Sequence, residues 1–425
     1  MGSALLMVLA LATGADGSPA ELKSEVNHWV RQLDAEELIR RTEAETKLLG
    51  LGPKILDLLP QYDEKSPPSE AQRREAVARI RDQLERRAAE ESTAPKVVKL
   101  KATARPLSEI LAEITRQTGT KFKDFRPQMG QEADDPKLSV DFDNTPFWPA
   151  VDQAFDQAKL AIYPFAGKEE LGYMAAERGA AASAGRITYA GPLRLAAAQL
   201  LAQRNLAAAG PGSLRLDVQV AWEPRLRPIM LQLPLADVKA VDDRGTPIAV
   251  ENPDGELEQS IDSEGSAIEF QLPLVNPLRS AQAIGSIKGK LRAMLPGRVE
   301  TFEFAELKDA KKVEQRRAGV AVTLDEVRQD GDVWEVRMRV RFDNAANALE
   351  SFRAWVYKNE AYLLGPKGKI PNGGYETTEQ RKDELGLAYK FDLPDGPAGL
   401  KFVYKTPAVI TSVPLPFEFK NLPLP

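Results

Sequence analysis

Val97–Phe122 reads VVKLKATARPLSEILAEITRQTGTKF, and Lys137–Pro164 reads KLSVDFDNTPFWPAVDQAFDQAKLAIYP. The second stretch repeats the first at a constant offset, and in each copy an alternating strand leads into a helix that begins at a proline. A second strand follows each helix. The repeat therefore predicts a small duplicated α+β module over residues 96–165. The aligned pairs are Pro106 with Pro146, Leu107 with Phe147, Leu111 with Val151, Ile114 with Ala154, and Phe122 with Ile162.

Apolar residues mark one face of each predicted helix. In the first copy they recur at the i, i+3, i+4, i+7 spacing of an amphipathic helix, and the second copy repeats the pattern. Two strand–helix–strand units side by side predict the order β-α-β-β-α-β, a single split-βαβ sheet covered by two helices. The first set is Leu107, Ile110, Leu111 and Ile114, and the second is Phe147, Ala150, Val151, Ala154, Phe155 and Ala158.

This region resembles the short N-terminal domain of secretins and TonB-dependent receptors. The resemblance lies in LKATARPLSEILAEITRQTG and in the second copy of the repeat, VDFDNTPFWPAVDQAFDQAKL. The second copy departs from the first at Lys159, which occupies the position of Gly119. It implies a docking module of the bacterial envelope without catalytic activity. The chain also resembles uncharacterised exported bacterial proteins with tails similar to PFEFKNLPLP, a resemblance that implies a compartment and no activity.

The N-terminal part of the chain predicts export and then helices. Ala4–Ala12 is a short apolar run that ends in a small-x-small pattern, so residues 1–18 are expected to be a signal peptide. Residues 19–92 read as helical, with Gly52-Pro53 ending one helix and starting the next. The segment resembles a HEAT-type hairpin but has too few repeats for a free-standing solenoid. A helical brace is therefore favoured over a peptide-binding helical surface.

Beyond the module the pattern changes to short strands separated by turns. Leu214–Trp222 and Trp334–Phe342 alternate strictly, and Asp330-Gly331 marks a hairpin. We expect one β-sandwich over residues 186–308 and a second, Ig-like, over 318–425. The proline-rich end, Pro407–Pro425, is expected to be an edge strand or an extended tail. The predicted fold class is multi-domain α+β: a HEAT-like segment, a duplicated βαββαβ module and two Ig-like β-sandwich domains.

Composition excludes several kinds of chemistry. The chain of 425 residues has no cysteine and a single histidine, His28, so disulfides, thiolate catalysis and structural zinc sites are excluded. No nucleophile motif accompanies His28, and no P-loop, GxGxxG or GxSxG motif occurs. The net charge is −5, and the basic residues do not cluster as they do in proteins that bind nucleic acid. We expect no enzyme activity, no cofactor, no metal and no transmembrane segment in the mature chain.

Seven residues stand out as candidate binding residues. Arg337, Arg339 and Arg341 alternate with core residues, so they share one face of a strand. They indicate either a docking face for an acidic partner, polysaccharide or phosphate, or a solvated face neutralised by neighbouring acids, and the second interpretation is favoured. The others are Trp148, which lies off the helix stripe, and Trp222, Arg225 and Arg227 in the segment WEPRLRP. For these, packing at a domain junction is favoured over a recognition site.

Carboxylates suggest two further alternatives. Asp141, Asp143 and Asn144 are calcium-type ligands, but they lack EF-hand spacing. A glycosidase needs two carboxylates about 5–10 Å apart, and the sequence singles out no such pair.

The favoured prediction is an exported, periplasmic or cell-surface binding or scaffold protein whose partner is an envelope protein or cell-wall component. Carbohydrate binding by a sandwich face is the alternative, and a carboxylate-dependent hydrolase is the third.

Overall fold

The computed structural model describes residues 19–425 except 61, 63–66, 68–69, 164–165, 168–169, 176–184, 205–206, 208–211, 262–264, 332, 343–353 and 382. The side chains of 297–298, 354–355 and 409 are also outside the description. The expected signal peptide, residues 1–18, therefore lies outside the described residues. The chain is mixed α+β with several sheets, as predicted, and it divides after Ala88 into two compact units.

The first unit is helical. Its helices bury one cluster that includes Val30, Leu48, Ile55 and Ile80. The guanidinium of Arg81 donates to the carbonyl of Leu56 at 3.0 Å and to that of Leu59 at 2.9 Å, which satisfies carbonyls at the end of a helix. The elements are α1 (Pro19–Gln32), α2 (Leu38–Leu51), the 3-10 helix η1 (Pro53–Leu58) and α3 (Ala71–Ser92), which continues past the unit boundary.

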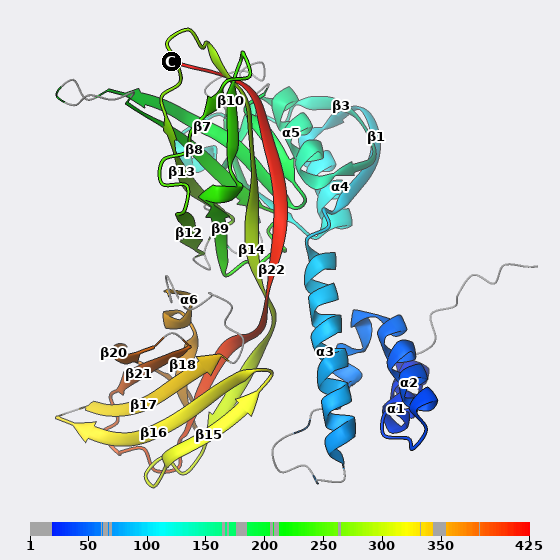
Figure 1. Ribbon diagram of the computed structural model, residues 1–425, viewed down its shortest axis with the longest axis vertical. Helices are drawn as coiled ribbons and strands as arrows, with labels where there is room; N and C mark the ends of the chain where they lie inside the picture. The colour runs from blue at the N-terminus through cyan, green and yellow to red at the C-terminus, as the bar shows by residue number, and fades with distance from the viewer. Residues whose placement is uncertain are drawn as a thin grey trace, which may run out of the picture. The chain divides into compact units, whose positions relative to one another are not determined.

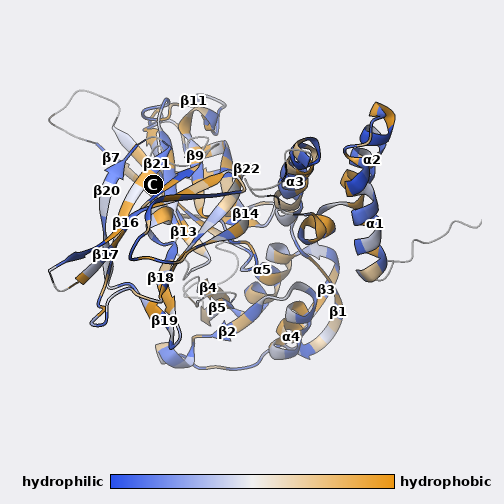
Figure 2. Ribbon diagram, turned by 90° about the horizontal axis from the view of Figure 1, so that it is seen from below, coloured by the Kyte–Doolittle hydropathy of each residue, from blue (hydrophilic) through white to orange (hydrophobic). Residues whose placement is uncertain are grey.

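The module begins the second unit, and its two helices lie between two sheets (Figure 2). The repeat predicted one sheet, and this prediction is wrong. β1 pairs antiparallel with β3, while β5, which comes after the repeat, joins β2 and β4 on the other side of the helices. Because β5 offers both second strands a partner, they do not pair with β1 or β3. The elements are β1 (Val97–Pro106), α4 (Leu107–Thr118), β2 (Lys121–Asp124), η3 (Pro127–Met129), β3 (Lys137–Pro146), α5 (Phe147–Ala158), β4 (Leu160–Tyr163) and β5 (Glu170–Ala175).

The two half-units of the module share one interior and are related by an approximate twofold axis. Leu100 pairs with Phe142 and Ala102 with Val140, so exchanging the half-units converts each pair into the other. The backbone bonds follow the same symmetry. The N–H of Leu107 donates to the carbonyl of Pro136 at 2.9 Å, and that of Phe147 to the carbonyl of Lys96 at 2.7 Å. The shared cluster contains, among others, Val98, Leu107, Ile110, Ile114, Leu138, Phe147, Val151, Phe155, Leu160 and Leu171.

A first β core follows the module. A four-stranded sheet in the order β13-β8-β7-β6 packs its buried side chains against those of β10, β14 and β22. Leu216 and Val220 from the first sheet join Ile287, Leu291 and their neighbours from the second. The strands are β6 (Ile187–Ala190), β7 (Leu193–Gln203), β8 (Ser213–Trp222), β9 (Met230–Pro234), β10 (Lys239–Asp242), β11 (Pro247–Ile248), β12 (Glu256–Ser260) and β13 (Ala267–Val275), with η5 at Leu235–Asp237.

A second β core lies between a five-stranded sheet, in the order β15-β16-β17-β21-β20, and the remaining part of the larger sheet. Met338 and Tyr389 from the five-stranded sheet meet Phe302 and Phe402 from β14 and β22. The elements are β15 (Lys311–Arg317), β16 (Val320–Asp330), β17 (Val333–Phe342), α6 (Ala354–Tyr357), β18 (Glu360–Gly365), β19 (Gly368–Pro371), β20 (Gly374–Gln380) and β21 (Glu384–Phe391).

One long antiparallel ribbon runs through both cores (Figure 1). β14 (Ala283–Phe304) pairs with β22 (Lys401–Pro423) from end to end, Ala283 with Pro423 and Phe304 with Phe402. The proline-rich end is thus a strand, and its Phe417 and Phe419 belong to the first core. The sequence predicted two β-sandwich domains that follow each other along the chain, at 186–308 and 318–425. In the structure, β14 from the first range and β22 from the second both contribute residues to both cores.

Candidate docking surfaces

Trp148 lies at the contact between the module and the first β core. It is 1% exposed, and its Nε1 donates to the carbonyl of Pro192 at 2.9 Å. One helical turn further, the carboxylate of Asp152 accepts from Arg194 Nε at 2.8 Å and from the hydroxyl of Tyr189 at 2.7 Å. A buried indole with a satisfied N–H is a packing residue. Trp148 therefore offers no binding surface in this structure.

The segment around Trp222 connects the first β core to the chain that enters the module. Trp222 is buried in that core. Arg225 donates to Glu223 Oε2 at 2.6 Å and to the carbonyl of Ser92 at 2.7 Å, and it also bonds the carbonyl of Ala94. Burial raises the pKa of Glu223, although the guanidinium of Arg225 opposes that rise. Arg225 therefore has a structural role, because it links the segment after β8 to the chain that enters the module. Arg227 is exposed.

The arginine stripe on β17 comes together as the alternation predicts, and acids surround it. Arg337 donates to Glu335 at 3.2 Å, and Arg339 makes a bidentate contact with Asp325 at 2.9 Å and reaches Glu384 at 3.3 Å. Arg341 stands directly opposite Glu384 in the ladder. This neutralisation matches the favoured interpretation of a solvated, ion-paired face, and an acidic partner finds little free positive charge here.

The outer edges of the β1–β3 sheet are occupied by glutamine side chains. The N–H of Lys99 donates to Gln117 Oε1 at 2.8 Å, and Gln117 Nε2 donates back to the carbonyl of Lys99 at 2.9 Å. At the symmetric position, the N–H of Ser139 donates to Gln157 Oε1 at 3.4 Å. An amide that accepts and donates takes the place of a neighbouring strand. Strand addition at these two positions would have to displace the glutamines.

The five-stranded sheet has one blocked edge and one open edge. At one end, β15 carries Lys311, Lys312, Arg316 and Arg317, and Lys312 adopts a positive φ of 51°; charges and irregular backbone of this kind deter strand addition. At the other end, β20 pairs with β21, and no described residue pairs with its far side. The side chains of β20 are largely exposed. β20 is therefore an exposed seven-residue strand with an open backbone edge, and β13 likewise lies at the end of its sheet.

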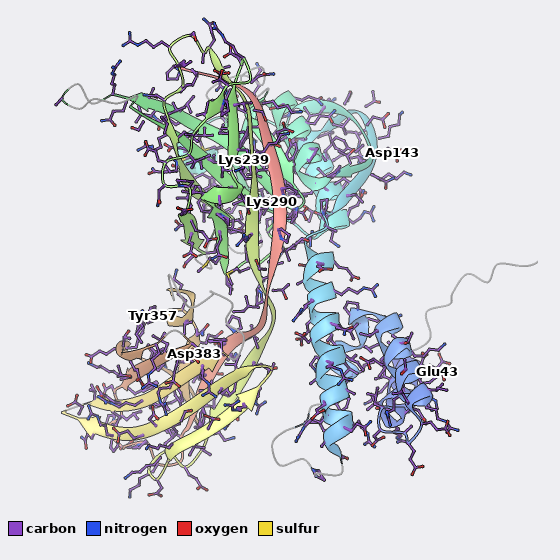
Figure 3. All side chains as sticks on the ribbon, in the orientation of Figure 1. Glu43, Asp143, Lys239, Lys290, Tyr357 and Asp383 are labelled. Carbon is purple, nitrogen blue, oxygen red and sulfur yellow. The ribbon has the colours of Figure 1, made fainter. Side chains whose placement is uncertain are left out.

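Two tyrosines stack at this open edge. The rings of Tyr357 and Tyr375 lie 5.5 Å apart between centroids with an interplanar angle of 4°, and Tyr375 is 43% exposed. Tyr375 in turn contacts the buried Tyr389 at a centroid distance of 5.9 Å. Figure 3 labels Tyr357 at the end of α6. This pair leaves aromatic surface beside the strand edge.

The acidic residues considered for calcium are engaged by cations. Asp141 accepts from Lys101 at 2.7 Å, and Asp143, labelled in Figure 3, lies 3.7 Å from Lys99. Within the described part of the chain, no three acids or histidines converge as metal ligands would. Asp141 and Asp143 therefore form cross-strand ion pairs.

Two carboxylates of β12, Glu256 and Glu258, lie close enough to influence each other. Burial, and then the neighbouring Glu258, raises the pKa of Glu256 on β12. Arg292 lies 3.9 Å from Glu256, and Gln232 Nε2 donates to Glu258 Oε1 at 2.6 Å. These contacts match a structural role for the pair.

Sequence reasoning did not identify β20 or the glutamine caps. The caps had a signal, since Gln117 and Gln157 occupy equivalent positions of the repeat. β20 had none, because the run GYETTEQ lacks the alternation of a half-buried strand.

Comparisons with known proteins place the chain in no family: no protein-family model matches it, and neither does any curated protein. None of the described helices combines the length and apolar character that crossing a bilayer requires.

Proposed function

We propose that the chain is a non-catalytic, exported binding or scaffold protein of the bacterial cell envelope that docks a partner protein at β20. The observation that carries this proposal is the open edge of β20 next to the exposed ring of Tyr375. In strand addition, an extended peptide gains affinity from main-chain hydrogen bonds and specificity from side-chain contacts.

Three other features support the proposal. The outer edges of β1 and β3 are occupied at Lys99 and Ser139, and β15 carries blocking charges. The module resembles a docking domain of envelope proteins, and the N-terminal apolar run is typical of exported chains. In this proposal the HEAT-like helices brace the protein, and the two Ig-like cores hold the β20 edge rigid.

A photo-crosslinking residue at Thr377 tests the docking strand. We expect the mature chain to form a defined adduct with an envelope protein from a bacterial extract. Thr378→Lys should abolish the adduct, because an exposed lysine on an edge strand opposes pairing. The matched control, Gln329→Lys, places the same charge on the exposed end of β16 and should leave the adduct intact. No adduct at Thr377, or an adduct insensitive to Thr378→Lys, contradicts the proposal.

Carbohydrate binding is the second candidate, and the Tyr357–Tyr375 stack favours it. Aromatic rings with one open face are common partners for apolar faces of ligands. Affinity electrophoresis in gels that contain cell-wall polysaccharide measures it. Retardation that Tyr375→Ala removes would support the sugar, whereas unchanged mobility of the native chain would count against it.

A further inference from the structure

A second surface, on the outer face of the first core, carries more cations than acids paired with them. Along β14, Ile287 and Leu291 point into the core, so Lys288 and Lys290 lie on the exposed face. Lys239 of β10 stands directly opposite Lys288 in the antiparallel ladder. Figure 3 labels Lys239 and Lys290 on these neighbouring strands. We name Lys239, Lys288 and Lys290 the lysine face.

The lysine face has one carboxylate within reach. Glu418 of β22 lies 3.5 Å from Lys288 and is shared with Lys420, also at 3.5 Å. Lys239 and Lys290 have no ion pair in the described part of the chain. The next cation along β14, Arg292, is instead paired with Asp237 at 3.5 Å.

Like charges directly opposite each other in a sheet oppose folding. The arginine stripe on β17 shows how this chain neutralises such an arrangement, with an acid beside Arg337 and two beside Arg339. Lys239 and Lys290 lack that compensation, even though the chain as a whole has a net charge of −5. A bound anion would supply the missing negative charge.

The spacing indicates the shape of the ligand. Residues two apart on a strand are about 6.6–6.8 Å apart along it, and residues directly opposite lie about 4.5–5.5 Å apart at Cβ. Lys288 and Lys290 are therefore neighbours along β14, and Lys239 lies beside Lys288 across the ladder, so the three lysines form a compact cluster that neighbouring phosphates of one ligand can contact. Lysine binds phosphate as a point charge, whereas the planar fork that matches a carboxylate belongs to arginine. We propose that the lysine face binds a linear polymer that carries repeated phosphate groups, a site separate from β20.

Binding of inorganic polyphosphate to the full mature chain tests this proposal. We expect binding at low salt that weakens as salt rises. The double variant Lys239→Gln/Lys290→Gln should bind about 30-fold more weakly. Its salt slope should fall by roughly 0.7 for each lysine removed.

The matched control is Lys99→Gln/Lys101→Gln, which removes two cations that are already paired with Asp143 and Asp141. It should keep the native affinity, and thermal melting should show that both double variants are folded. Absence of binding at low salt, or equal weakening in the two double variants, overturns the proposal. Binding to phosphatidylglycerol vesicles without binding to polyphosphate also overturns it, because the ligand would then be a membrane surface.

Discussion

Tyr389 and Tyr404 lie near each other in the second core but differ in their hydroxyl groups. The hydroxyl of Tyr404 accepts from Asn359 Nδ2 at 2.8 Å, whereas that of Tyr389 is buried with no hydrogen-bond partner among the described residues. Burial raises the pKa of both phenols. An unsatisfied buried hydroxyl lowers stability, while a satisfied one contributes to it.

Tyr389→Phe is therefore expected to leave the free energy of unfolding unchanged or to raise it by about 1 kcal/mol. Tyr404→Phe, the matched control, should lower it by about 1 kcal/mol because it leaves the Asn359 amide without this acceptor. Denaturant unfolding followed by tryptophan fluorescence measures both. Equal destabilisation by the two substitutions would show that the Tyr389 hydroxyl has a partner.

Glu335 is a buried carboxylate whose charge should be visible in the pH dependence of stability. Burial alone would raise its pKa, but hydrogen bonds from Arg328 and Arg337 outweigh burial, so the pKa lies below the ordinary value of 4.5. A carboxylate with a lowered pKa stabilises the fold above the unfolded-state pKa. That contribution is lost as the pH falls through the folded-state value.

Glu335→Gln should lower stability at pH 7 by about 2 kcal/mol, with the deficit shrinking as the pH falls below about 4.5. Urea unfolding at a series of pH values measures this difference. The control Glu269→Gln changes an exposed carboxylate on β13. A deficit that does not depend on pH would mean that the charge of Glu335 is not what stabilises the face.

The same face shows what the sequence reveals at the residue scale. Alternation was enough to place Arg337, Arg339 and Arg341 together, because a strand has a period of two. The sequence predicted that acids on neighbouring strands would neutralise these arginines. It could not say which acids, because Asp325 and Glu384 come from other strands. Lys239 and Lys290 went unnoticed for the same reason: only the register of β10 on β14 brings them together.

At the scale of elements, the two helices of the module end in the same way despite different residues. Gly119 ends α4 with φ +80°, and Lys159 ends α5 with φ +56°, both left-handed. The departure from the repeat at Lys159 therefore does not change the backbone. A non-glycine residue is strained in this left-handed conformation. Nothing lies within 4 Å of a Cβ built on Gly119, so a side chain at that position would meet backbone strain but no steric clash.

Lys159→Gly should therefore raise the free energy of unfolding by up to about 1 kcal/mol, because it removes the strain of a left-handed side chain. Gly119→Ala should lower it by about 1 kcal/mol for the converse reason. Thermal unfolding of the two variants beside the native chain measures both effects. A loss of stability in Lys159→Gly, or no loss in Gly119→Ala, would contradict the equivalence of the two helix ends.

Elements with strong periodicity were predictable, and those that depend on pairing were not. The expected runs Leu214–Trp222 and Trp334–Phe342 appear as β8 and β17. In β7 the alanine-rich run LRLAAAQLLAQ has no strand pattern and is held by β8. Within β14, Gly289 reads as a break, yet a Cβ there would meet the ring of Phe417 at 2.6 Å, so close packing requires glycine.

At the scale of the whole molecule, the β14–β22 ribbon is the feature that the prediction of two successive β-sandwich domains did not include. The end of β22 buries Val413, Leu415, Phe417, Phe419 and Leu422 in the first core. Burying five such side chains contributes roughly 10 kcal/mol, a value comparable to the stability of a whole domain.

Deletion of residues 407–425 should therefore unfold the first core. Hydrogen exchange should show loss of protection in β7 and β8, with the control deletion of Pro425 alone leaving protection unchanged. An accessory tail would instead leave β7 and β8 protected in the truncated chain.

The most direct test of the docking proposal is hydrogen exchange of the full chain with and without the partner identified by crosslinking at Thr377. The proposal predicts that binding slows exchange in β20 and leaves β1, β3 and β15 unchanged. Slower exchange at β1 or β3, or no change in β20, would contradict it.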